Sequence, residues 1–132
     1  SKYKKTHFRK MDEDCLVDAS LLGLLLYIKD EESDVKSIFE TEAIISIEQF
    51  EDDPYEFAKQ KGYQFSKINK HKYLLEKEDE KILDKQYYYE DEDLKFIINL
   101  EVRKEKLNET EIKEVVSEFD RMNKSAKIRK MK

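Results

Sequence analysis

The residue types used most often for nucleophilic or metal chemistry are scarce in this chain of 132 residues. Its one cysteine, Cys15, lies in an apolar run directly after Asp14, whereas a thiol becomes nucleophilic in an electropositive setting. The two histidines, His7 and His71, form no zinc-ligand spacing with each other or with the cysteine. We therefore expect a buried Cys15, two histidines in surface or local hydrogen-bonding roles, and no catalytic, metal or cofactor site.

Carboxylates are abundant, and they gather in three clusters that could attract a hard cation. The clusters are residues 12–14, 51–53 and 90–93. A Ca²⁺ loop needs spaced oxygen ligands and a glycine at its turn, and none of the three clusters contains a glycine. We expect solvated turns at these positions.

Asp84 and the Glu101-x-Arg103 motif fall on two neighbouring predicted strands. Two acids and a cation on adjacent strands resemble the core of metal-dependent nucleases of the PD-(D/E)xK class, in which acids bind Mg²⁺ and a lysine orients water. This chain departs from that pattern because Arg103 stands in place of the lysine and no proline precedes Asp84. A metal-dependent nuclease is therefore one alternative function.

An aromatic and anionic cluster is the preferred candidate for a partner-binding surface. Successive side chains of a strand alternate between its two faces, so at least one ring of residues 87–89 must point away from the others, and we expect an exposed tyrosine there. Tyrosine is enriched at protein interfaces. The alternative is that these rings half cover the sheet. The predicted partner-binding residues are Tyr87, Tyr88, Tyr89, Glu90, Asp91, Glu92 and Asp93.

Charge is segregated along the chain, whose net charge is −5. Residues 1–10 and 124–132 together hold 10 of the 26 basic residues and none of the 31 acidic ones, so the segment between them has a net charge of −15. Such a body repels nucleic acid and attracts a protein with a basic surface. A nucleic-acid-binding accessory protein that clamps phosphates with its basic ends is the second alternative function.

Composition favours a single domain over residues 1–132, with 39% hydrophobic residues in a periodic arrangement. No apolar stretch suits a targeting signal or a membrane span, and one cysteine permits no internal disulfide, so we expect a cytoplasmic protein. Many Lys, Glu, Ile and Tyr residues, with two Gly, one Pro and no Trp, are typical of an AT-rich coding sequence, such as that of a phage, a mobile element or a low-G+C genome.

The N-terminal half should contain helices and at least one strand. Residues 15–28 are almost entirely apolar and Leu-rich, which favours a core helix that is covered within the chain or, in a homodimer, by a second copy. Residues 34–42 carry a helical stripe after Ser33. The β-branched residues 43–47 indicate a strand, and a helix should begin at Asp53–Pro54 and end at Gly62.

The C-terminal half predicts an antiparallel meander followed by a helix. Residues 94–103 alternate between apolar and polar side chains, as in a half-buried strand. Shorter strands are predicted at 63–68, 73–77 and 82–89. Asn108 and Glu111 form a capping box, and an apolar helical stripe follows at Ile112, Val115, Val116, Phe119 and Met122 before the pattern fails at Asn123.

These patterns predict an α+β fold: an N-terminal apolar helix, short helices, a meander of three to five strands and a C-terminal helix packed on the sheet. With no catalytic motif, we expect a non-enzymatic acidic protein that regulates or inhibits a partner with a basic surface. Phage anti-defence and immunity proteins are of this general type.

Overall fold

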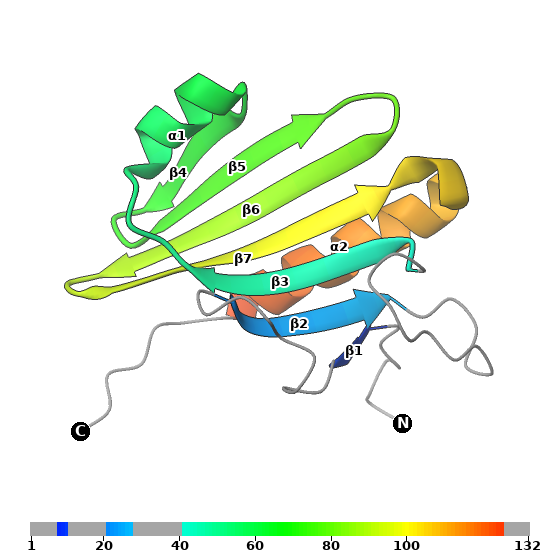
Figure 1. Ribbon diagram of the computed structural model, residues 1–132, viewed down its shortest axis with the longest axis horizontal. Coiled ribbons are helices and arrows are strands. Elements are labelled where there is room, and N and C mark those ends of the chain that lie inside the picture. The colour runs from blue at the N-terminus through cyan, green and yellow to red at the C-terminus, as the bar shows by residue number, and fades with distance from the viewer. Residues whose placement is uncertain (1–7, 11–20, 28–40, 126–132) are drawn as a thin grey trace.

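The computed structural model describes residues 8–10, 21–27 and 41–125 of the chain. They form one seven-stranded antiparallel sheet with two α-helices, which confirms the α+β class (Figure 1). The strands lie in the order β1-β2-β3-β7-β6-β5-β4. The elements are β1 (Phe8–Lys10), β2 (Leu21–Tyr27), β3 (Ala43–Gln49), α1 (Pro54–Lys61), β4 (Gln64–Asn69), β5 (Lys72–Glu78), β6 (Ile82–Asp91), β7 (Leu94–Arg103), a 3₁₀ turn (Lys104–Lys106) and α2 (Glu109–Ser125).

The predicted antiparallel meander is present as β4-β5-β6-β7, with each strand paired to the next in sequence. The sheet is larger than the three to five strands predicted, because β7 also pairs with β3 on its other side. β3 in turn pairs with β2, and β2 with β1. The pairing of β3 with β7 therefore places residues from the first half of the chain next to the β6–β7 hairpin.

The predicted helix over residues 15–28 is wrong where the structure describes that segment, because residues 21–27 form strand β2. Leu24 and Leu26 are buried on one face of this strand and Tyr27 on the other. A strand that is covered on both faces has a continuous apolar run, which cannot be distinguished from a core helix by its periodicity. The remaining residues of the predicted helix, and residues 34–40 of the next one, lie outside the described residues.

Both α-helices begin, and α1 also ends, where the predicted capping residues lie. In α1, Pro54 follows Asp53 at the start, and Gly62 adopts a left-handed conformation (φ 80°) at the end. In α2, the backbone N–H of Asn108 donates to Glu111 and that of Glu111 donates to the Asn108 side chain, which is a capping box. Neither helix in the described part of the chain is long and apolar enough to cross a bilayer.

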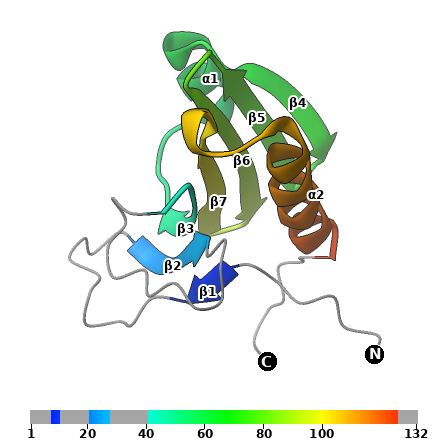
Figure 2. The same ribbon diagram turned by 90° about the vertical axis from the view of Figure 1, so that its right-hand side faces the viewer.

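The helices cover different parts of the two sheet faces. Helix α2 lies along one face (Figure 2), where its Val115 and Phe119 pack in a core with Ile45, Leu100 and Tyr87. Helix α1 covers the opposite face at the β4–β5–β6 end, where Ala58 packs with Leu75 and Tyr88. β6 is therefore covered on both faces.

Candidate partner-binding surface: an acidic groove beside the β6–β7 hairpin

The three consecutive tyrosines of β6 are all buried, so the prediction of an exposed ring is wrong. Tyr87, Tyr88 and Tyr89 are 8%, 2% and 2% exposed. They alternate between the faces as expected, but each face is covered at this point. Tyr87 and Tyr89 lie in the core beneath α2, and Tyr88 lies in the core beneath α1. In this arrangement less than a tenth of each tyrosine is accessible to a partner.

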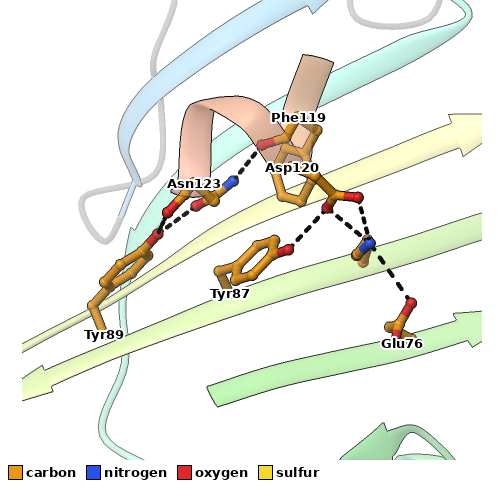
Figure 3. A network of polar contacts seen from close by, with 7 residues as sticks. Glu76, Tyr87, Tyr89, Phe119, Asp120 and Asn123 are labelled. Carbon is orange, nitrogen blue, oxygen red and sulfur yellow. Dashed lines mark hydrogen bonds and ion pairs between the residues drawn. The ribbon is translucent and has the colours of Figure 1, made fainter. Parts of the chain in front are cut away.

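Tyr87 and Tyr89 join the sheet to α2 through hydrogen bonds (Figure 3). The hydroxyl of Tyr87 donates to Asp120 over 2.9 Å, and the hydroxyl of Tyr89 donates to the side chain of Asn123 over 2.6 Å. Asn123 in turn donates to the backbone carbonyl of Phe119. Asn123 is fully buried, although the apolar pattern predicts the end of the helical stripe there.

Lysines complete this network beneath α2. The ammonium of Lys85, itself buried, lies 2.8 Å from the carboxylate of Asp120 and 3.7 Å from that of Glu76 (Figure 3). Lys72 donates to the backbone carbonyl of Asn123 and lies over the rings of Tyr87 and Tyr89. Burial lowers the pKa of Lys72. Part of the acidic body is thus neutralised by the protein's own lysines.

Burial keeps the tyrosine hydroxyls in their neutral, donating form. It raises the pKa of Tyr89, and burial followed by the hydrogen bond to Asp120 raises the pKa of Tyr87. The pKa of Tyr88 is also raised, mainly by burial. The three residues therefore act as structural donors and packing groups rather than as ionisable groups.

The acidic half of the predicted cluster lies at the surface, at the tip of the β6–β7 hairpin. Glu92 and Asp93 form its two-residue connection, and both are exposed. Glu92 has a left-handed backbone (φ 53°), a conformation that glycine or asparagine adopts more easily. Two-residue hairpin connections ordinarily require a positive φ, so the turn itself accounts for this conformation.

A second acidic cluster meets this hairpin in space. The pairing of Gln49 with Phe96 places the end of β3 beside the start of β7, and residues 51–53 follow directly. Between the two segments lies a groove of about 620 Å³. It is lined by Gln49, Phe50, Glu51, Glu92, Asp93, Leu94, Lys95 and Phe96, and we call it the acidic groove.

The acidic groove combines carboxylates at its rim with apolar side chains. Leu94, the first residue of β7, is 49% exposed. Phe96 stacks on Tyr89 with ring centroids 4.9 Å apart, and Phe50 packs edge-on against Tyr88 at 4.8 Å. Two of the predicted tyrosines thus contact phenylalanines of the groove lining, Tyr89 from the α2 face of the sheet and Tyr88 from the α1 face. The one lysine of the lining, Lys95, lies 3.9 Å from Glu90.

Sequence patterns did not identify the groove residues from β3 and its connection. Residues 51–53 are predicted only as a solvated turn, and their exposure confirms that prediction. Leu94 and Phe96 are visible only as apolar positions of an alternating strand. Nothing local in the sequence indicates that these segments meet, because the β3–β7 pairing that joins them is a long-range contact.

The residues of the nuclease alternative lie together, and each of the two acids has a polar neighbour within the protein. Asp84 and Glu101 are directly opposite each other on β6 and β7. Tyr63 donates to Asp84 over 2.9 Å, and Arg103 lies 3.8 Å from Glu101. Among the described residues, no group of three or more His, Cys, Asp or Glu side chains is placed to hold a metal ion.

The other predicted residues fall into two groups. His71 is exposed and lies within hydrogen-bonding distance (2.9 Å) of the backbone carbonyl of Glu90, as predicted for a local role. Cys15, His7 and the cluster 12–14 lie outside the described residues, as do most of the two basic ends.

Comparison with known proteins gives no relative for this chain. No protein-family model matches it, and no curated protein or solved structure shows significant similarity to it. The function must therefore be inferred from the site itself.

Proposed function

We propose that this chain is a non-enzymatic binding protein that regulates or inhibits a partner by covering a basic surface with its acidic groove. The observation that carries this proposal is the convergence of Glu51 with Glu92 and Asp93 around a groove that also exposes Leu94. Carboxylates would pair with lysine or arginine side chains, and the apolar lining would receive an apolar anchor of the partner.

The mechanism is steric occlusion after electrostatically steered association. The negative body attracts a positive surface from a distance, which accelerates encounter and makes the rate fall as salt rises. Suitable partners are the nucleic-acid-binding groove of a nuclease or polymerase, or a toxin. We place the encounter in the cytosol of a cell invaded by a phage or mobile element.

The walls of the groove favour binding without rearrangement. Phe50 packs on Tyr88, which is buried beneath α1. Phe96 packs on Tyr89, which is buried beneath α2. A rigid surface loses less conformational entropy when it binds, so more of the contact energy remains as affinity. In this proposal Tyr88 and Tyr89 do not contact the partner, but they hold Phe50 and Phe96 of the acidic groove in place.

Neutralising the acidic groove should weaken binding of a basic ligand by about tenfold or more, since each lost rim charge reduces attraction and leaves a partner cation less well paired. The variant is the triple substitution Glu51→Gln, Glu92→Gln, Asp93→Asn. The probe is a fluorescent synthetic peptide of alternating arginine and leucine, followed by anisotropy at about physiological ionic strength.

A matched triple variant separates the groove from bulk charge. Glu80→Gln, Glu105→Gln and Glu114→Gln remove the same charge from exposed positions outside the groove. We expect the affinity of this control to change by about threefold or less, because distant exposed charges are screened. An equal loss of affinity in both variants would show that net charge alone attracts the peptide, and the groove proposal would fail.

A further inference from the structure

A band of polar side chains crosses the sheet face opposite α2, between the α1 core and strand β3. Side chains of alternate residues share a face, so the strand register places them in two adjacent rows. Asp84 is opposite Glu101 in one row, and Gln86 is opposite Asn99 in the next. Ser46 of β3 extends the second row beside Asn99. We call these five residues, with the hydroxyl of Tyr63, the polar band.

Tyr63 reaches the polar band because of the way α1 ends. The backbone N–H groups of Gly62 and Tyr63 both donate to the carbonyl of Ala58, and the left-handed Gly62 turns the chain toward the sheet. The Tyr63 ring stacks on Phe57, with centroids 5.8 Å apart. Its hydroxyl then donates to Asp84.

The hydrogen bonds of the polar band leave a shortage of donors. The side-chain N–H₂ of Gln86 lies 3.4 Å from both Asp84 and the Tyr63 hydroxyl, and it is directed toward them. The two amide oxygens, Gln86 Oε1 and Asn99 Oδ1, are buried and accept no hydrogen bond. Buried acceptors without a donor are rare in folded proteins, because each loses its hydrogen bond to water without replacing it.

The polar band is also short of positive charge. Arg103 is near Glu101, but its guanidinium also donates to the backbone carbonyl of Thr41. Lys77, on the strand next to Asp84, donates instead to the backbone carbonyl of Lys61. Burial raises the pKa of Asp84, although the hydrogen bonds from Tyr63 and Gln86 and the charge of Lys77 act in the opposite direction.

We propose that the polar band is a second binding site, which takes a guanidinium group such as an arginine side chain or a small guanidine compound. Guanidinium is a planar cation with five N–H donors and no acceptor, so it can face two carboxylates at once. It supplies the missing donors once the amide groups of Gln86 and Asn99 turn their buried oxygens toward it. The acceptor-bearing residues occupy a rectangle of about 5 by 7 Å on the two strands, which suits donors spread over a plane.

A metal ion suits the polar band less well. Ca²⁺ and Mg²⁺ need several oxygens within about 2.6 Å of one point, and the oxygens of Asp84 already accept from Tyr63 and Gln86. The apolar neighbours Ile44 and Ile97 flank the band on β3 and β7, where they can contact the methylene groups of an arginine side chain. This site is separate from the acidic groove, so either site can exist without the other.

The test is a titration of the full chain with ethylguanidinium, followed by the amide signals of the ¹⁵N-labelled protein. We expect saturable shifts of the side-chain NH₂ signals of Asn99 and Gln86 and of the backbone signals at Asp84 and Glu101. Ethylurea, which has a similar shape but no charge, should bind about tenfold more weakly or worse, because charge-assisted hydrogen bonds are about twice as strong as neutral ones.

Variants make the result specific to the polar band. Glu101→Gln should weaken ethylguanidinium binding by about tenfold through loss of a charge-assisted contact, whereas Glu92→Gln in the acidic groove should leave it unchanged. The amide spectrum reports at the same time whether each variant is folded. The proposal is overturned if shifts do not saturate at the polar band, if Glu101→Gln binds like the wild type, or if MgCl₂ or CaCl₂ produces the same shifts.

Discussion

Replacing Phe119 with alanine is expected to lower the free energy of unfolding by about 4 kcal/mol, the usual cost of truncating a fully buried phenylalanine. Phe119 is 0% exposed and lies in the middle of the apolar stripe of α2. Its ring centroid is 5.5 Å from that of Tyr87, and it packs against the same core as Leu100 and Val102. Urea denaturation followed by circular dichroism measures the change.

Ser117→Ala on the same helix is the control for Phe119. Ser117 is exposed, so its truncation should change the free energy of unfolding by about 0.5 kcal/mol or less. If Phe119→Ala lowered the free energy of unfolding by less than about 1 kcal/mol, α2 would not cover the sheet as described. Truncating a buried ring of this size destabilises a protein by more than that.

Replacing Asn123 with alanine is expected to lower the free energy of unfolding by about 2 kcal/mol, because the buried hydroxyl of Tyr89 loses its closest acceptor. The bond from Asn123 to the Phe119 carbonyl is lost as well. The single substitution Tyr89→Phe removes the same hydrogen bond by deleting its donor hydroxyl. Thermal and urea denaturation of the single and double variants measure both effects.

The double variant distinguishes a specific bond from a general loss of packing. Once Asn123 is alanine, the change of Tyr89 to phenylalanine should cost little, so the two effects should fall short of additivity by about 1 kcal/mol. The exposed neighbour Lys124, changed to alanine, serves as the control. Full additivity would contradict the network drawn in Figure 3.

Elements that are buried on one side could be predicted from the sequence. β7 alternates between apolar and polar residues, and α2 repeats apolar residues along one stripe, because each buries one face and exposes the other. The caps at Asn108 and Gly62 are also local signals, since each depends on a few neighbouring residues. These elements are found where they were predicted.

Elements that are covered on both sides could not be predicted in this way. β2 has a continuous Leu-rich run that favours a helix by propensity, and its pairing with β1 and β3 makes it a strand. Tyr88 is buried because α1 folds over the second face of β6, which no local pattern reports. Asn123 lies one turn after Phe119 on the buried stripe of α2. The burial of this polar side chain could not be predicted from the sequence, because it depends on the hydrogen bonds with Tyr89 and with the Phe119 carbonyl.

The candidate binding surface was predicted in part. The hairpin carboxylates Glu92 and Asp93 are exposed as expected, whereas the tyrosines beside them are not. Glu51 joins the same groove through the long-range pairing of β3 with β7. A sequence reveals a charge cluster, but a surface made by two clusters requires the topology that brings them together.

The most direct test of the acidic groove as the partner-binding surface is to map where a basic ligand lies. The alternating arginine and leucine peptide, carrying a nitroxide spin label, broadens amide signals near its bound position in the ¹⁵N-labelled protein. The proposal predicts that signals of residues 49–53 and 92–96 lose intensity first, while those of Glu80 and Lys113 remain. Broadening centred on α2 or on the β5–β6 turn, with the groove signals intact, would contradict it.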